Sequence, residues 1–355
     1  MSDSRDPLAG RIPVTLVTGF LGSGKTTMIS RLVRHPSMAR VAVVINEIGE
    51  IGIDHDIVTM SSENIALLAN GCICCSVRTD LQETLRDLFA RRRVGEVADF
   101  DRVVIETTGL ADPAPVVQTL SSDTLLAAQY RLDGLVTLVD AVNGASQLAN
   151  HAEPAKQIAL ADRVFVTKSD IAPSAALEEL KSAIQQINPG AGVSLVVNGE
   201  VDPAQLTGLG LASAKAGPAT LSFLGEPLQG EGAQGERRLV KPSPLHDASI
   251  RTLSLRFDQP FTWTAFSAAL ELLATLRGPD LLRVKGIVNV EGAPVVVQGV
   301  QHIFHPPVPL DRWPSADTGT RLVFITRRIE AQTIRNLLNA VADATPPEDG
   351  AKSGG

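Results

Sequence analysis

The stretch Val14–Arg31, VTLVTGFLGSGKTTMISR, decides the fold of this chain. An apolar, β-branched run ends at Gly19, a glycine-rich turn follows, and from Lys25 onward apolar residues recur at helical spacing. The turn has the spacing Gly-x4-Gly-Lys-Thr of a phosphate-binding loop, in which backbone N–H groups and the N-terminal end of a helix face one anion. The sequence therefore predicts a strand, a phosphate loop and a helix in succession.

The polar residues of this loop have expected roles in binding a nucleotide. Lys25 is expected to reach the β- and γ-phosphates, and the Thr26 hydroxyl is expected to bind Mg²⁺. The other predicted nucleotide contacts of the loop are Gly19, Gly22, Ser23, Gly24 and Thr27. Lys25 and Thr26 are also the predicted catalytic residues of the loop, because Lys25 contacts the transferred phosphate directly and Thr26 acts on it through Mg²⁺.

Apolar runs later in the chain predict a mostly parallel sheet with helices on both faces. The expected strands are 41–45, 65–68, 102–105, 135–139, 164–166 and 193–197, and helical spacing of apolar residues is found at 81–89 and 177–187. Strands that alternate with helices favour a doubly wound α/β fold. Because polar motifs follow these strands, we expect them to meet at one edge of the sheet.

The predicted strand at 102–105 leads into Glu106-Thr107-Thr108-Gly109. Enzymes with a phosphate loop place here an acidic residue that helps to hold Mg²⁺ and a glycine whose N–H can sense the γ-phosphate. Glu106 and Gly109 are therefore predicted catalytic residues, and Glu106 is a predicted Mg²⁺ ligand with Thr26.

A guanine-reading motif is predicted at Thr167-Lys168-Ser169-Asp170. An Asp carboxylate accepts hydrogen bonds from N1–H and the exocyclic amino group of guanine, whereas adenine has no donor at N1, and each charge-assisted bond contributes about 1.5–3 kcal/mol. Lys168 and Asp170 are accordingly predicted to select GTP over ATP. Asn198, just beyond the last predicted strand of the sheet, is a further candidate nucleotide contact.

The three cysteines, Cys72, Cys74 and Cys75, fall within four residues. This clustering favours metal or redox chemistry over a disulfide framework. Thiolates select Zn²⁺ or Cu(I), and a four-coordinate zinc needs further ligands, for which Glu47 and Glu50 are the candidates. A purely structural zinc site and a Cys72/Cys75 redox pair are the two alternatives.

Composition and length set further expectations. The net charge is −7, and no apolar run approaches the roughly 20 residues that span a bilayer, so we expect neither a nucleic-acid nor a membrane partner. The first ten residues are polar and show no export signal, which indicates a cytoplasmic protein. The predicted organisation is a disordered N-terminus at 1–11, a nucleotide-binding domain at 12–207, a linker at 208–249, a smaller α+β domain at 250–343 and a disordered tail at 344–355.

The motifs GFLGSGKTT, NEIGE, NGCICC, VIETTGLADPAP and VTKSD, in this order, resemble those of the CobW/YjiA-like family of P-loop GTPases, relatives of UreG and HypB. The resemblance implies a GTPase with weak intrinsic turnover that uses GTP and Mg²⁺. It also implies Cys72, Cys74 and Cys75 as ligands of zinc, cobalt or another transition metal, assisted by a carboxylate of the NEIGE segment.

The predicted function is that of a metallochaperone that hydrolyses GTP, with coupled nucleotide and metal sites and a client metalloprotein as partner; the sequence also allows a homodimer. For the residue that orients the attacking water, Glu47, Glu50 and Asp54 are candidates. Two other functions stay open at this point. One is a nucleotide-gated partner-binding module, in which hydrolysis only resets the switch, and the other is a P-loop small-molecule kinase.

Overall fold

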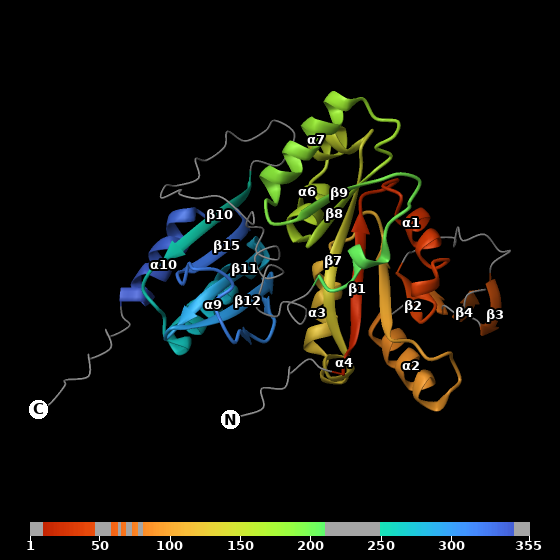
Figure 1. Ribbon diagram of the computed structural model, residues 1–355, viewed down its shortest axis with the longest axis horizontal. Helices are drawn as coiled ribbons and strands as arrows, with labels where there is room; N and C mark the ends of the chain where they lie inside the picture. The colour runs from red at the N-terminus through yellow and green to blue at the C-terminus, as the bar shows by residue number, and fades with distance from the viewer. Residues whose placement is uncertain are drawn as a thin grey trace, which may run out of the picture.

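The computed structural model describes residues 10–46, 58–62, 65–68, 73–76, 81–209 and 249–343. Two β-sheets organise these residues, one of nine strands and one of six (Figure 1). The segments predicted as the two termini and the 208–249 linker lie almost entirely outside the described residues, as do Cys72, Glu47, Glu50 and Asp54.

The first sheet has the strand order β3-β4-β5-β2-β6-β1-β7-β8-β9. Its strands are β1 (Ile12–Gly19), β2 (Val41–Asn46), β3 (Val58–Ser62), β4 (Ile65–Leu68), β5 (Ile73–Ser76), β6 (Arg102–Thr107), β7 (Tyr130–Asp140), β8 (Arg163–Thr167) and β9 (Gly192–Val196). From β5 to β9 every neighbouring pair is parallel, while β3, β4 and β5 pair antiparallel. The predicted mostly parallel sheet is therefore confirmed.

Helices cover both faces of this sheet, because its central strands are apolar on both sides. On one face, Val17, Val104 and Val136 pack with residues of α1. On the other face, Leu16, Ile105 and Leu135 pack with residues of α2, α3, α6 and α7. The helices of this part are α1 (Lys25–Leu32), α2 (Leu81–Val94), α3 (Ala114–Ser122), α4 (Thr124–Gln129), α5 (Gly144–Asn150), α6 (Glu153–Leu160) and α7 (Ser174–Ile187).

The second sheet is antiparallel and has the order β10-β15-β11-β12-β13, with β14 paired to β12. Its elements are β10 (Ile250–Phe257), α9 (Trp263–Arg277), β11 (Leu281–Val290), β12 (Ala293–Val300), β13 (Ile303–Phe304), β14 (Val308–Pro309), β15 (Thr320–Arg327) and α10 (Ala331–Asp343). Residues of α9 and α10 share one apolar cluster with the sheet, which confirms the predicted α+β architecture. The short strands β13 and β14 were not predicted.

The other face of the second sheet lies toward the helices of the first. Leu282, Val300 and Ile325 of the second sheet belong to the same buried cluster as Ile158 of α6. Figure 1 shows α6 and α7 on the side of the first sheet that faces β10 and β11. One continuous apolar interface therefore joins the two sheets.

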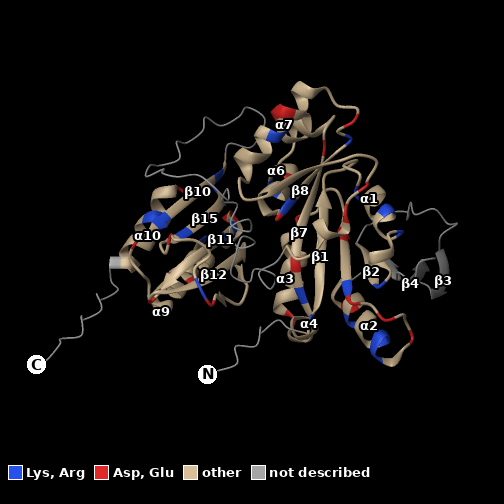
Figure 2. Ribbon diagram, in the orientation of Figure 1, with Lys and Arg blue, Asp and Glu red and all other residues tan. Residues whose placement is uncertain are grey.

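Charges of both signs are interspersed along the elements of both sheets (Figure 2). Among the described residues, no helix combines the length and the apolar character needed to cross a bilayer.

Candidate functional site

The phosphate loop lies at the end of β1, in the centre of the first sheet. Gly22 and Gly24 adopt left-handed φ angles of +73° and +90°, which side chains other than glycine rarely allow. At Gly19 the reason for glycine is contact, since an added Cβ would lie 2.4 Å from the carbonyl oxygen of Leu138. Helix α1 starts directly after Gly24 with no side-chain cap, so its first N–H groups remain available to an anion.

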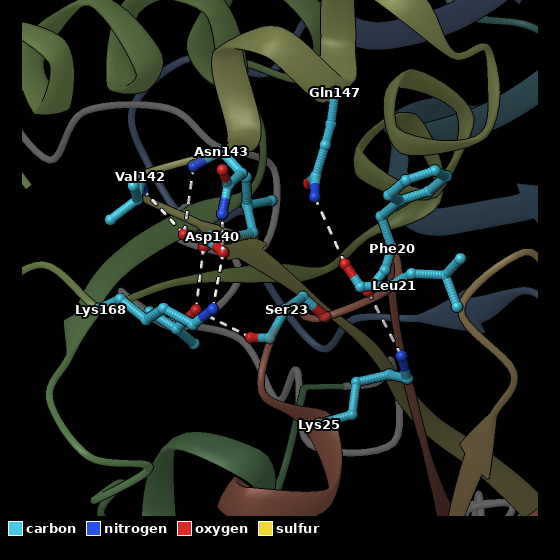
Figure 3. A network of polar contacts seen from close by, with 11 residues as sticks. Phe20, Leu21, Ser23, Lys25, Asp140, Val142, Asn143, Gln147 and Lys168 are labelled. Carbon is cyan, nitrogen blue, oxygen red and sulfur yellow. Dashed lines mark hydrogen bonds and ion pairs between the residues drawn. The ribbon is translucent and has the colours of Figure 1, made fainter.

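Lys25 and Ser23 provide the polar side chains of the loop. The Lys25 ammonium lies against the loop itself and donates to the carbonyl oxygens of Gly19 at 2.9 Å and Phe20 at 3.4 Å (Figure 3). Ser23 Oγ is buried and has no hydrogen-bond partner among the described residues. A phosphate oxygen in the loop would satisfy this hydroxyl, so the loop fits the nucleotide phosphates that its spacing predicts.

The predicted magnesium ligands Thr26 and Glu106 are in contact, although 80 residues separate them in sequence. The Thr26 hydroxyl donates to Glu106 Oε1 at 2.9 Å. The contact forms because β1 and β6 are parallel neighbours, with Val17 opposite Glu106, so both strands end beside the loop. Glu106 is 1% exposed, and a buried carboxylate next to a hydroxyl is a donor set that suits Mg²⁺.

Gly109 lies against the tip of the phosphate loop. A Cβ at this position would lie 2.8 Å from the backbone nitrogen of Leu21, so only glycine allows the two segments this close. Two further contacts hold the same tip. Gln147 Nε2, in α5, donates to the Leu21 carbonyl at 3.3 Å (Figure 3). The ring of His151, the residue after α5, lies 4.8 Å from the Phe20 ring. The tip is therefore supported from two sides.

The predicted base-reading motif joins the loop at the end of β8. Thr167 Oγ1 donates to the Ser23 carbonyl at 2.8 Å, so this threonine joins the end of β8 to the phosphate loop. Lys168 has a left-handed φ of 56°, and its ammonium pairs with Asp140 at 2.8 Å. Asp170 is exposed, and no described residue is bonded to its carboxylate.

Asp140, at the end of β7, is the centre of a small network that sequence reasoning missed (Figure 3). Its carboxylate accepts from the Lys168 ammonium, from the side-chain amide of Asn143 at 2.9 Å and from the backbone N–H of Val142 at 2.8 Å. Burial alone would raise the pKa of Asp140, but these hydrogen bonds, first of all from Lys168, hold it below its usual value. The signal available in the sequence was its place directly after a predicted strand.

Asn198 lies in the turn after β9, with a left-handed φ of 52°. The next residue, Gly199, is packed so closely on the start of α1 that an added Cβ would lie 3.0 Å from the Met28 nitrogen. Asn198 is thereby held near the phosphate loop.

The cysteine segment differs from the expectation in one respect. Strand β4 was expected to lead to the cysteines at its carboxyl end, but β4 is antiparallel to β5, and Cys74 and Cys75 lie within β5. Because β5 is parallel to β2, with Cys75 opposite Val44, the segment returns toward the edge that holds the phosphate loop. Strand β2 lies between β5 and β6, so two strand spacings, about 10 Å in total, separate β5 from β6.

The metal-ligand set as a whole is not described, because Cys72, Glu47 and Glu50 lie outside the described ranges. Within those ranges, no three His, Cys, Asp or Glu side chains are grouped as metal ligands would be. The structure does bring together the other predicted site residues at one sheet edge: Gly19, Gly22, Ser23, Gly24, Lys25, Thr26, Thr27, Glu106, Gly109, Lys168, Asp170 and Asn198.

Comparison with known proteins gives matches over nearly the whole chain. The sequence profile "CobW/HypB/UreG, nucleotide-binding domain" matches residues 13–194, and the profile "Cobalamin synthesis protein cobW C-terminal domain" matches residues 250–342. The chain is 33% identical over 333 residues to a zinc chaperone named YjiA from Escherichia coli, covering 91% of this chain and 96% of the relative. It is 32% identical over 366 residues to a zinc chaperone named CobW from Pseudomonas aeruginosa, covering 92% and 91% of the two chains.

Solved structures give the same relationship. The crystal structure of Zn(II)-bound YjiA GTPase from E. coli superimposes with a TM-score of 0.70 at 30% sequence identity, covering 93% of this chain and 99% of that one. The likeness includes both sheets, because it spans nearly all of each chain.

Proposed function

This chain belongs to the family of CobW, HypB and UreG nucleotide-binding proteins, and from that premise we propose that it is a zinc-handling GTPase. In this proposal it hydrolyses GTP to GDP and phosphate, binds zinc as cargo at the cysteine segment, and supplies the metal to a client metalloprotein in the cytoplasm. The nucleotide-binding domain corresponds to 12–207 and the C-terminal domain to 250–343.

The observation that carries the proposal is the contact between Thr26 and Glu106 at the mouth of the phosphate loop. It joins the first turn of α1 to the end of β6, and these two side chains would hold Mg²⁺ beside the phosphates. When bound, Mg²⁺ neutralises charge that develops on the transferred phosphate. A plain glycine-rich turn would need neither a buried carboxylate nor a hydroxyl at this place.

The residues of the chain then divide the work of hydrolysis. A water oxygen bonds to the γ-phosphorus while the bond to the β–γ bridging oxygen breaks, and GDP leaves with that electron pair. The Lys25 ammonium exchanges its contacts with the loop carbonyls for the phosphate oxygens, where it stabilises negative charge. In this proposal the N–H of Gly109 binds the γ-phosphate, and the packing of the 109 position on Leu21 of the loop supports that role.

The arrangement at β8 supports guanine as the base. Asp170 is exposed with its carboxylate open to a ligand, while Lys168 is held beside it by Asp140. A carboxylate matches the paired donors of guanine, and facing adenine it would lose these bonds. This favours GTP hydrolysis over an ATP-dependent kinase reaction.

The cargo site is proposed at Cys72, Cys74 and Cys75 with a carboxylate of Glu47 or Glu50. Strand β5, which carries Cys74 and Cys75, is separated by β2 alone from β6, which carries Glu106. About 10 Å separates these two strands, and in this proposal the nucleotide and the metal affect each other's binding. Linkage then requires GTP and zinc to change each other's affinity by the same factor.

Two measurements on purified protein test this function. The first compares hydrolysis of GTP and ATP in Mg²⁺, for which we expect turnover of GTP and a much lower rate with ATP. The second determines the zinc content, and the zinc affinity with and without GTP and Mg²⁺, for the native chain and for a variant with Cys72→Ser, Cys74→Ser and Cys75→Ser.

We expect bound zinc in the native chain only, and a zinc affinity that changes with GTP. A stable GTP-bound protein that ignores metal would instead favour the partner-binding module, and phosphate transfer to an acceptor molecule would favour the kinase. Equal zinc content in the two chains would remove the cysteines from the cargo site.

A further inference from the structure

Helix α6 lies between the two sheets and is buried on nearly all sides. Its buried residues include Pro154, Ala155, Gln157, Ile158, Ala159 and Leu160. In Figure 1, α6 is on the side of the first sheet that faces β10 and β11. One of the buried residues, Gln157, is polar and only 1% exposed, and a polar side chain at this depth needs hydrogen-bond partners.

Gln157 binds the segment Gly109–Asp112, which begins with the predicted γ-phosphate sensor, Gly109. Its side-chain Nε2 donates to the carbonyl oxygens of Gly109 at 3.2 Å and Ala111 at 3.1 Å. On the other side of the same amide, Oε1 is buried and has no hydrogen-bond partner among the described residues. A side chain needed only for packing would not leave an amide oxygen without a partner at this depth.

The neighbouring residue adds a second contact to the same segment. The Lys156 ammonium pairs with Asp112 Oδ2 at 2.5 Å. The helix itself is fixed to the sheet, because Thr137 Oγ1 in β7 donates to the Gln157 backbone carbonyl at 2.8 Å. Helix α6 therefore presents two side chains to the 109–112 segment from a fixed position.

The C-terminal end of α6 is tied to the second sheet. Two residues beyond the helix, Asp162 accepts from Arg283 and, at 2.8 Å, from Lys285, both on β11. Its other oxygen accepts from the Leu135 N–H of β7 at 2.9 Å. All three charged side chains are at least nine-tenths buried, so this cluster fixes β11 to the end of α6.

We propose that Gln157 is a positioning residue for GTP hydrolysis, and that through helix α6 the docking of the C-terminal sheet sets the 109–112 segment against the γ-phosphate. This inference rests on the proposed GTPase function and adds to it a residue and a route of control. Gln157 acts through the backbone of Gly109 and does not itself touch the nucleotide.

The physical reason is the freedom of Gly109. Contact with Leu21 excludes any side chain at this position, and a glycine without other restraints populates many backbone conformations. Holding its carbonyl and that of Ala111 selects one of them and so fixes the segment beside the loop. When the segment shifts on γ-phosphate binding, Gln157 Oε1 is available to accept a hydrogen bond from one of its backbone N–H groups.

The test uses the full chain with Gln157→Met, which keeps the length of the side chain and removes both donors. We expect kcat for GTP to fall about tenfold with KM nearly unchanged, since the base and loop contacts remain. We also expect the affinity for GDP to stay the same, because GDP has no γ-phosphate for the 109–112 segment to meet. Gln118→Met, at an exposed position on α3, is the matched control and should leave all three values as they are.

The second arm tests the route from the C-terminal sheet. Lys285→Met keeps the Arg283–Asp162 pair, so the buried cluster retains a balanced charge pair. We expect Lys285→Met to lower kcat without changing KM. We also expect the Lys285→Met/Gln157→Met double variant to be no slower than Gln157→Met alone, because both changes act on the 109–112 segment.

Two results would overturn the inference while the GTPase function stood. One is native hydrolysis with Gln157→Met kinetics equal to the native values. The other is a fall in rate that matches the unfolded fraction of the Gln157→Met protein, so that kcat per folded molecule equals the native value. Additive effects of Lys285→Met and Gln157→Met would refute the route through α6. Absence of GTP hydrolysis in the native chain would count against the proposed function itself.

Discussion

The Thr26 hydroxyl donates a 2.9 Å hydrogen bond to Glu106 Oε1 and so joins the phosphate loop to the end of β6. Each side chain alone is an ordinary strand-end or helix-start residue. Their contact creates a hydroxyl and a carboxylate at one point, beside an N-terminal helix end that binds phosphate.

Glu106→Gln tests the magnesium role of this pair. The amide still accepts from Thr26, so the fold should persist, but the negative charge that favours Mg²⁺ is lost. We expect GTP turnover to fall roughly 10²-fold and the Mg²⁺ concentration for half-maximal rate to rise. Thr26→Ser, which keeps the hydroxyl, is the control, and a Glu106→Gln variant with native Mg²⁺ dependence would contradict the assignment.

Asp170→Asn tests base selection. Loss of a charge-assisted hydrogen bond should lower kcat/KM for GTP roughly 10²-fold. XTP should become the better substrate, because the Asn amide can donate to the C2 carbonyl of xanthine while its oxygen accepts from N1–H. The measurement is hydrolysis of GTP, XTP and ATP side by side. Asp87→Asn on α2, an exposed carboxylate paired with Arg91, is the matched control; unchanged discrimination in Asp170→Asn would refute the assignment.

Gly109→Ala tests the close approach of the 109 position to the phosphate loop. The new Cβ would lie 2.8 Å from the Leu21 nitrogen and 2.9 Å from its Cα, so backbone has to move. A displacement of this kind should lower kcat/KM for GTP roughly 10²-fold. Gly192→Ala is the control, since its nearest contact is at 3.7 Å from Arg163. Equal rates in the two variants would show that the approach does not matter for turnover.

The surroundings of His305 predict that the free energy of unfolding depends on pH, independently of catalysis. Burial, with a further contribution from the nearby Arg283 charge, lowers its pKa from 6.5 to about 4, while Asp162 acts in the opposite direction. Between these two pH values the unfolded chain binds a proton that the folded chain does not. The free energy of unfolding should therefore decrease as pH falls from about 6.5 to about 4, by about 3 kcal/mol from this group.

The measurement is thermal or denaturant unfolding of the full chain at pH 7, 6 and 5. His305→Gln should flatten the slope, because glutamine binds no proton in this range. His302→Gln changes an exposed histidine three residues away and should retain the native slope. The same slope in both variants would assign the pH dependence to another group.

Much of the fold could be predicted from sequence because its signals are local. Runs such as 41–45 and 102–105 are apolar throughout, as strands buried on both faces must be, and they were found within a few residues of their bounds in β2 and β6. Helix α7 was visible from its one-sided apolar spacing. Helix α6 was missed because it has only eight residues and starts without a side-chain cap, so few local signals mark it.

The candidate site divides in the same way. Gly24, Lys25 and Thr26 act through neighbours a few residues away, so spacing alone identified them. Asp140 and Gln157 depend on partners 28 and 48 residues away, Lys168 and Gly109, which nothing in their local sequence indicates.

The amino-acid sequence by itself determined the phosphate loop, the order of strands and helices, and the residue types suited to phosphate, guanine and metal, because backbone conformation and side-chain chemistry are properties of short segments. Only the tertiary structure decided which of these residues meet. Parallel pairing brought Glu106 to Thr26, the antiparallel turn of β4 placed Cys74 and Cys75 within a strand, and packing of the second sheet set Arg283 against Asp162. Contacts of this kind depend on strand register and on the shape of the assembled core, and so they are fixed only when the whole chain has folded.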